Sequence, residues 1–182
     1  LLNFDLPGKI EASATQSRSY NFNTDYSTNG TPAEVMVSIA KAQIGKTESN
    51  LGYTEAWCAD FVCDCAKLAG QSEAIPFDGW CTSLIEKVID AGGKKVSSRQ
   101  AGDLVFYHCS SCARYVHVGL VLDSTHSIEG NYSNKVTKVQ SSYTDSKGHK
   151  LSAGTITRVY VRPNYDDSNI STPTLKVYYN AN

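Results

Sequence analysis

The sequence has no long hydrophobic run and no strong excess of charge of either sign. None of its apolar stretches approaches the roughly 18 consecutive residues that a membrane-spanning helix needs. Its 17 Lys and Arg residues are matched by 18 Asp and Glu residues, for a net charge of -1. Such a chain offers no basic surface for nucleic acid or anionic lipid. We therefore expect a protein with no membrane span and no nucleic-acid partner.

A signal segment and internal repeats are also missing. The chain begins at Leu1, and no basic stretch precedes an apolar one. We therefore expect a processed or excised piece of a longer protein, with any export signal outside it. The 182 residues suffice for one domain of ordinary size with a sizeable core.

The periodic patterns predict helices first and strands afterwards. Helical spacing of apolar residues, with caps and glycine stops, predicts helices over residues 32–44, from near 55 to 69, and 81–91. Alternating patterns predict strands over residues 103–107, 117–122, 127–129, 135–139 and 154–161. This order is typical of the α+β class, with N-terminal helices packed on a C-terminal antiparallel sheet.

The two ends of the chain differ from this central part in composition. Residues 1–30 are polar and aperiodic, and we expect an N-terminal leader or linker there. Residues 31–163 form the predicted domain. Residues 164–182 are expected to be a C-terminal linker or the start of a further module, with residues 174–179 as one more strand in the second case.

Six cysteines are many for a chain of this length. The even number fits three disulfides in an oxidising compartment, or a thiol enzyme with spare buried cysteines. Three of them lie in one predicted helix, residues 55–69, which read EAWCADFVCDCAKLA. Cys58 is in its first turn, where free backbone N–H groups and the positive helix end lower a thiol's pKa. Cys65 falls on the apolar side, whereas Asp60 and Asp64 mark the side expected to face solvent.

A thiolate becomes a useful nucleophile when a base lies beside it, and the chain has four histidines. His149 is in a polar loop and is expected to face solvent, and His126 is at a predicted hairpin bend. His108 adjoins a cysteine and could face the core or a metal. His117 opens an apolar strand, and a rigid strand can hold a base against a helix end. We therefore expect His117 to be the partner of Cys58.

The next predicted strand offers a third polar group. Glu129 and Asn131 are two residues apart, so they share one face of an extended segment. A carboxylate beside the second nitrogen of a histidine fixes the tautomer of the ring and stabilises the imidazolium. Asn131 could orient the ring, bind a ligand or serve only as a turn residue.

Four segments together resemble the CHAP family, the cysteine, histidine-dependent amidohydrolases/peptidases related to NlpC-type papain-like hydrolases. They are residues 57–62 (WCADFV), 102–106 (GDLVF), 117–121 (HVGLV) and 128–131 (IEGN). The resemblance extends over residues 31–162 and keeps the order and spacing of the motifs. It implies a papain-like fold, with residues 31–163 as the catalytic domain. By this resemblance Cys58 is the nucleophile, His117 the base, Glu129 the orienting acid and Asn131 a fourth polar member.

The family implies cleavage of an amide bond of bacterial peptidoglycan. The bond is either the N-acetylmuramoyl-L-alanine linkage or one within the stem peptide or cross-bridge. Such domains occur in autolysins and phage endolysins, so we expect a monomer or a unit attached to a wall-binding module. The protein would be secreted or associated with the bacterial cell wall, or it would be a phage endolysin that reaches the wall at lysis. The alternative is a non-catalytic wall-binding or protein-interaction module of the same fold.

Three aromatic residues close to the predicted nucleophile in sequence are candidates for lining a substrate groove: Tyr53, Trp57 and Trp80. Packing in the core or at the rim is the alternative for each of them. Cys81, which follows Trp80 at a predicted helix start, is expected to be structural or to line the groove. Residues 47–52 contain one carboxylate and lack the oxygen-rich spacing of a calcium loop, so we expect no required metal or cofactor.

Cys109 and Cys112 form a Cys-x-x-Cys pair between two predicted strands. Such a pair can be half of a zinc site, a redox couple or a disulfide across a hairpin. Zinc needs two more ligands, and the chain has no second Cys-x-x-Cys. A redox couple is expected before a helix, whereas the residues after Cys112 indicate a strand. We therefore favour a local disulfide or two free thiols, and a metal-stabilised binding domain is a third functional alternative.

Overall fold

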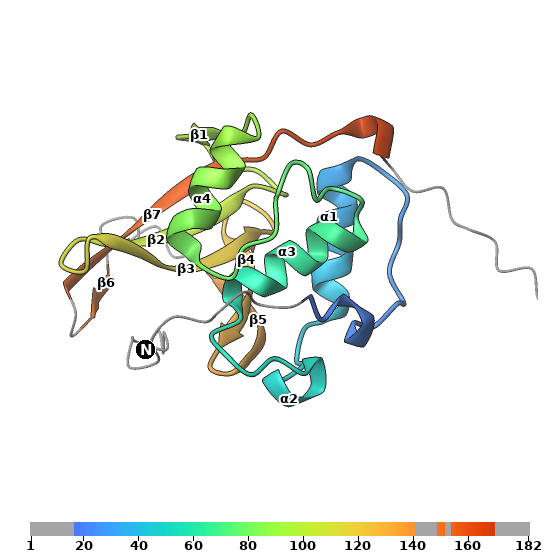
Figure 1. The fold of residues 1–182 in the computed structure, drawn as a ribbon, viewed down its shortest axis with the longest axis horizontal. Helices are drawn as coiled ribbons and strands as arrows, with labels where there is room; N and C mark the ends of the chain where they lie inside the picture. The colour runs from blue at the N-terminus through green and yellow to red at the C-terminus, as the bar shows by residue number, and fades with distance from the viewer. Residues whose placement is uncertain (1–16, 141–148, 152–153, 170–182) are drawn as a thin grey trace, which may run out of the picture.

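The computed structural model describes residues 17–140, 149–151 and 154–169, which form four α-helices and one antiparallel sheet (Figure 1). The helices are α1 (Pro32–Ala42), α2 (Glu48–Leu51), α3 (Cys58–Leu68) and α4 (Cys81–Asp90). The strands are β1 (Lys94–Val96), β2 (Leu104–Cys109), β3 (Arg114–Val121), β4 (His126–Tyr132), β5 (Lys135–Gln140), β6 (His149–Leu151) and β7 (Gly154–Arg162). Short 3-10 turns cover Ser19–Asn21 and Asp167–Asn169.

The strands pair in the order β1-β7-β2-β3-β4-β5, and β6 pairs with β7 outside this path. Every neighbouring pair is antiparallel. Helix α3 contacts β3 and β4 as well as α1, and α4 contacts β3 and β7. The predicted α+β class, with N-terminal helices packed on an antiparallel sheet, is therefore confirmed. No helix in the described part of the chain is long and apolar enough to cross a membrane.

The helix boundaries follow local capping. At α1 the Thr31 hydroxyl accepts a hydrogen bond from the Glu34 N–H, and the Glu34 carboxylate accepts one from the Thr31 N–H. This capping box was readable in sequence. The start of α3 is at Cys58, later than expected, with Trp57 as its N-cap. The short elements α2, β1 and β6 were not predicted, because three or four residues carry too little periodicity. Strand β6 begins at His149, which was expected in a loop.

Helix α3 is buried on almost all sides. This corrects the expectation that the face with Asp60 and Asp64 is exposed to solvent. The side chains of Asp60 and Asp64 have no exposed surface. Asp64 accepts hydrogen bonds from the Ser17 hydroxyl, the Arg18 backbone N–H and the Tyr53 hydroxyl. The first described residues therefore cover the face that helical periodicity assigned to solvent.

Parts of both predicted linkers pack on the domain. Phe22 is buried and stacks on Phe61 of α3, with ring centroids 5.7 Å apart. The side chain of Gln71 bonds the backbone of Asp166 through both its amide nitrogen and its oxygen. The predicted domain limits at residues 31 and 163 stay predictions. Residues 1–16 and the predicted strand at residues 174–179 lie outside the described residues.

The corner before β2 contains a buried carboxylate. Asp103 accepts hydrogen bonds from Arg162 Nε at 2.9 Å and Nη2 at 3.0 Å, and from the Gln100 N–H at 2.8 Å. We expect Asp103→Ala to lower the free energy of unfolding by about 1–3 kcal/mol, because it removes three hydrogen bonds to a carboxylate that is 1% exposed. Chemical denaturation measures the change. Asp123→Ala, at a carboxylate that is 46% exposed, should cost about 1 kcal/mol or less, and equal costs would contradict the expectation.

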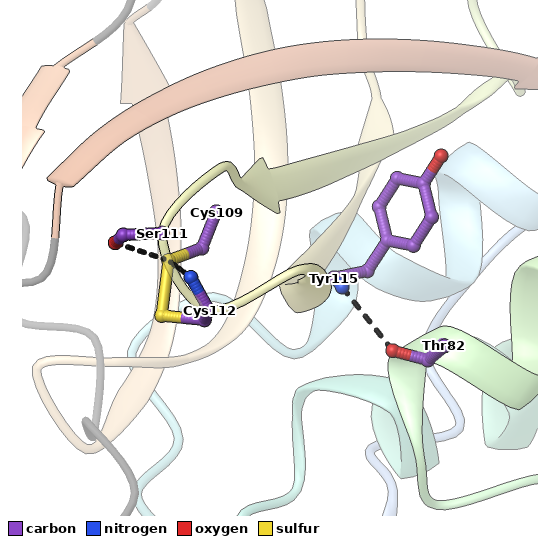
Figure 2. Close-up of a disulfide and its surroundings, with 5 residues drawn as sticks. All are labelled: Thr82, Cys109, Ser111, Cys112 and Tyr115. Carbon is purple, nitrogen blue, oxygen red and sulfur yellow. Dashed lines mark hydrogen bonds between the residues drawn. A yellow bond between two sulfur atoms is a disulfide. The ribbon is translucent and has the colours of Figure 1, made fainter.

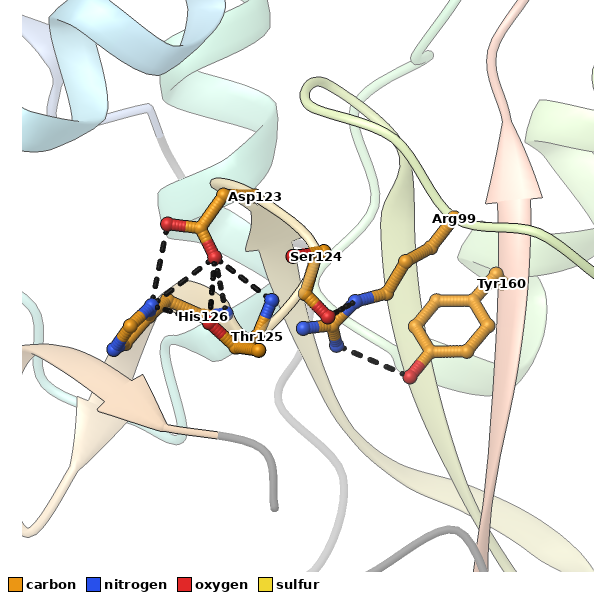
Figure 3. A network of polar contacts seen from close by, with 6 residues as sticks. All are labelled: Arg99, Asp123, Ser124, Thr125, His126 and Tyr160. Atoms are coloured by element: carbon orange, nitrogen blue, oxygen red, sulfur yellow. Dashed lines mark hydrogen bonds and ion pairs between the residues drawn. The ribbon is translucent and has the colours of Figure 1, made fainter. Parts of the chain in front are cut away.

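The turn between β3 and β4 has its own polar network (Figure 3). The Asp123 carboxylate accepts hydrogen bonds from the backbone N–H groups of Thr125 and His126, at 2.8 and 2.7 Å. Arg99 donates to the Ser124 carbonyl and, through Nη1, to the Tyr160 hydroxyl. The Nδ1 atom of His126 is 3.0 Å from Asp123 Oδ1. The bend itself covers residues 123–125, and His126, which was expected at the bend, is the first residue of β4.

Candidate active site

Cys58 is the first residue of α3 and is 7% exposed. The carbonyl of its neighbour Trp57 accepts the Phe61 N–H, which is the first bond of the helix. The amide groups of the opening turn therefore point towards the start of the helix, where they favour negative charge on a thiol. Gly130 of β4 lies against this start, since an added Cβ there would meet Phe61 Cβ at 2.6 Å.

His117 lies next to the Cys58 thiol, and Glu129 lies next to His117. His117 is 3% exposed and lies inside β3, three residues past its start, not at the mouth of a strand as expected. Its Nε2 is 2.8 Å from Glu129 Oε2 on β4. The thiol and the imidazole are hydrogen-bonding partners. Because Nε2 faces the carboxylate, Nδ1 is the ring nitrogen left for the sulfur.

Electrostatics favours the charged forms of all three groups. A hydrogen bond from Cys81 holds the pKa of Cys58 well below its usual value, and His117 adds to this effect against the cost of burial. Burial opposes a charged ring, but Cys58 and Glu129 together raise the pKa of His117 to about 10. Burial likewise opposes the Glu129 carboxylate, while hydrogen bonds from His117, Ser127 and Tyr107 lower its pKa. These shifts favour a thiolate on Cys58 and an imidazolium on His117.

Two residues that the sequence analysis did not identify form hydrogen bonds to the second carboxylate oxygen of Glu129, Oε1. The Tyr107 hydroxyl and the Ser127 hydroxyl both donate to Glu129 Oε1, the latter at 2.6 Å. Ser127 precedes Glu129 by two residues on the same strand face, so its position was readable in sequence. Tyr107 is opposite His117 in the β2–β3 register, which only the structure reveals.

Gly119 makes room for the carboxylate. The pairing of Leu120 with Ile128 puts Gly119 level with Glu129, whose side chain passes over it towards His117. A Cβ at position 119 would meet Glu129 Cγ at 2.5 Å and Cδ at 3.1 Å. An isolated glycine in an apolar strand is a sequence signal for such a close approach.

We expect Gly119→Ala to lower the activity of the site by about 10–100-fold, because it displaces the Glu129 carboxylate from His117. Hydrolysis rates of the single variants and of Gly119→Ala combined with Glu129→Gln measure the effect. In the Glu129→Gln background the alanine should cost little more. Full additivity of the two losses would contradict this role for Gly119.

Asn131 is not joined to the histidine. It has a φ of 56° in a β4–β5 irregularity and is 8% exposed. Its side chain makes no hydrogen bond within the described residues. The structure therefore does not join Asn131 to the Cys58–His117–Glu129 arrangement, and its role stays a prediction.

The aromatic residues predicted to line a groove divide into two kinds. Trp57 has no exposed surface and Tyr53 is 3% exposed, and their rings stack 5.1 Å apart in the core. Neither presents a surface to a ligand, because the first described residues and α3 enclose them. Trp80 is 41% exposed, with the Arg114 guanidinium 5.2 Å from its ring centroid. Among the three candidates, only Trp80 has a face available for binding.

The six cysteines also separate by environment. Cys109 and Cys112 are joined in a disulfide at the β2–β3 hairpin, so a zinc site and free thiols are excluded there (Figure 2). The Tyr115 N–H, just beyond this hairpin, donates to the Thr82 hydroxyl at 3.2 Å and ties β3 to the start of α4. Within residues 17–140, 149–151 and 154–169, no group of three or more His, Cys, Asp or Glu side chains could hold a metal.

The remaining cysteines are free and buried. Burial raises the pKa of Cys65 well above its usual value, as expected for a packed thiol, and also raises that of Cys63. Cys81 is different, because its sulfur lies 3.7 Å from that of Cys58. This neighbour of the proposed nucleophile was expected only as a structural or groove-lining residue.

Comparisons with known proteins assign neither a family nor a function to this chain. No protein-family model matches the chain, and a search of curated proteins finds no match. A family and a function for the chain must therefore be argued from its own residues and from the buried Cys58–His117–Glu129 arrangement.

Proposed function

We propose that this protein is a peptidoglycan hydrolase of the CHAP family that cleaves an amide bond by a thiol mechanism. The observation that carries the proposal is the buried chain of contacts from the Cys58 thiol through His117 to Glu129. A nucleophile, a base and an orienting carboxylate in hydrogen-bonding contact are what acyl transfer requires. The four sequence segments that resemble the CHAP family contain all three residues.

Each residue has a separate step in the proposed reaction. The Cys58 thiolate attacks the scissile carbonyl carbon and forms a tetrahedral intermediate. The His117 imidazolium then donates its proton to the leaving amine, and the thioester remains on the sulfur. The neutral ring next takes a proton from water, which attacks the thioester and releases the acid. Glu129 keeps the ring in one orientation and stabilises its charged form.

The start of α3 supplies one stabilising contact for the intermediate. The backbone N–H of Cys58 is at the positive end of the helix and has no partner within it. A donor that faces the developing oxyanion is typically worth about 3 kcal/mol of barrier. The proposed papain-like fold is supported by this arrangement, in which a helix start presents the thiol to two strands of an antiparallel sheet.

The proposed substrate and location are supported by separate features. Trp80 offers an exposed aromatic face beside Cys81, close to the nucleophile, where a sugar or peptide could stack. The Cys109–Cys112 disulfide favours an oxidising environment such as the outside of a bacterial cell. We propose a secreted or wall-associated enzyme, or an endolysin, that acts as a monomer or beside a wall-binding module.

Digestion of purified peptidoglycan tests the proposal and identifies the bond. Mass spectrometry of the products should show new amino termini. Free lactyl groups on muramic acid would identify the amidase reaction, and new peptide ends would identify the endopeptidase reaction. A protein that binds the wall in a pull-down but releases no product would contradict the hydrolase and favour the non-catalytic wall-binding module.

A further inference from the structure

We propose that Cys58 and Cys81 form an oxidation site, in which hydrogen peroxide converts the two thiols into a reversible disulfide. This modification goes beyond the hydrolytic reaction, since it needs a second sulfur that hydrolysis does not use. Its effect on catalysis depends on the proposed function, whereas formation of the bond does not.

The geometry brings two helix starts to one point. Cys58 is the first residue of α3 and Cys81 the first residue of α4, and each follows a tryptophan as N-cap. Their sulfurs are 3.7 Å apart, and a disulfide needs about 2.05 Å. Small side-chain rotations can close such a gap. Both helix starts favour negative charge, which assists thiol chemistry at either sulfur.

The two sulfurs have unequal roles. Cys58 contacts the His117 ring, and the hydrogen bond from Cys81 and this contact lower the pKa of the Cys58 thiol. Cys81 donates a hydrogen bond to Cys58, and this bond is the main cause that raises the pKa of Cys81 well above its usual value. Burial of the thiol raises this pKa further, so Cys81 keeps its proton. Cys58 is therefore the sulfur that peroxide attacks first, and Cys81 is the thiol that resolves the product.

The other free cysteines are placed differently. The Cys63 sulfur points to the backbone carbonyls of Pro76 and Asp78, at 3.8 and 3.7 Å. Cys65 is a buried residue of the same helix with no exposed surface. Among the described residues, Cys81 is thus the free thiol in contact with Cys58.

The reaction balances in two steps. The Cys58 thiolate attacks one oxygen of hydrogen peroxide, the O–O bond breaks, and the leaving hydroxide takes a proton to become water. Cys58 is then a sulfenic acid. The Cys81 sulfur next loses its proton and attacks the Cys58 sulfur, while the S–O bond breaks and the hydroxide leaves as a second water. Two thiols are oxidised by two electrons in total, and one peroxide is reduced to two waters.

The Cys58–Cys81 disulfide protects the Cys58 sulfur from further oxidation and at the same time removes its reactivity. A disulfide cannot attack a carbonyl, so the proposed hydrolase would be inactive until a thiol reductant restores the Cys58 thiol. Without a resolving cysteine, a sulfenic acid proceeds to the sulfinic acid, which ordinary thiols do not reduce.

Peptide mapping tests the proposal without any activity measurement. The reduced protein is exposed to hydrogen peroxide, blocked with an alkylating agent, and cut with trypsin and an enzyme that cleaves before aspartate. The four free cysteines then lie on separate peptides, residues 47–59, 60–63, 64–67 and 78–87. We expect a disulfide between the peptide of residues 47–59 and the peptide of residues 78–87. Its mass should be lower than the summed mass of the two thiol peptides by two hydrogen atoms, and dithiothreitol should separate the two peptides.

Variants separate the proposal from general oxidation. In Cys81→Ser, peroxide should leave Cys58 with two added oxygens, and recovery of its thiol by dithiothreitol should fall about tenfold. The matched control, Cys63→Ser, should keep the cross-link. Recovery of an alkylated Cys81 peptide from peroxide-treated wild type, beside an oxidised or unchanged Cys58, would overturn the proposal even if no variant folds. A cross-link without hydrolysis by the reduced protein would contradict the proposed function alone.

Discussion

Cys58→Ala is expected to lower the rate of peptidoglycan cleavage by at least about 10³-fold, because it removes the thiolate that attacks the carbonyl and forms the thioester. The buried His117 and Glu129 would remain paired, so the variant should still fold. The rate is measured as release of amino groups from purified cell walls and as loss of turbidity. The variant should keep any affinity for the wall, since Trp80 and the surface around it are unchanged.

Cys65→Ala is the matched control for this experiment. Cys65 lies in the same helix and is buried, but it contacts neither the imidazole nor the carboxylate. It should lose some stability, with cleavage near the wild-type rate at a temperature where both proteins are folded. Equal clearing of walls by wild type and Cys58→Ala would contradict the thiol mechanism.

Glu129→Gln is expected to lower cleavage by about 10²–10⁴-fold and to change its pH dependence. The carboxylate helps to raise the pKa of His117 to about 10. The thiolate–imidazolium pair therefore persists from the low pKa of Cys58 up to that value, and activity should fall as the pH rises through it. Without the negative charge the imidazolium loses its proton more readily, so the alkaline limb of the pH–rate profile should move to lower pH.

The profile of kcat/KM against pH measures this shift. Asp123→Asn, at an exposed carboxylate of the β3–β4 turn, is the control and should leave both the rate and the limb unchanged. A Glu129→Gln variant that loses activity with an unmoved alkaline limb would contradict the electrostatic role and leave only a packing role for this residue.

The sequence predicted much of the site because its signals were local. The position of Cys58 in the first turn of a helix depended on neighbours within a few residues, as did the alternation that assigned His117 and Glu129 to strands. The three groups do meet in the structure. His117 could be chosen because it was predicted to open an apolar strand, whereas the other histidines were predicted at a bend, beside a cysteine or in a polar loop.

The errors came from contacts between distant segments. Asp64 was assigned to solvent because helical periodicity shows which face is polar but not what covers it. Hydrogen bonds from Ser17, Arg18 and Tyr53 satisfy the carboxylate. Trp57 and Tyr53 were candidates for a groove or for core packing because of their short distance from Cys58 along the chain, and the structure shows them stacked inside the core. Nearness in sequence did not determine which way these side chains point.

By itself, the sequence determined the α+β class, the position of Cys58 near a helix start and the strand positions of His117 and Glu129. These features depend on hydrogen bonds and side-chain spacing within a few residues. Only the tertiary structure decided that Tyr107 bonds the Glu129 carboxylate and that the Cys81 sulfur lies beside Cys58. Strand register and the packing of α4 set those contacts, and both arise from burial of apolar surface shared by the whole chain.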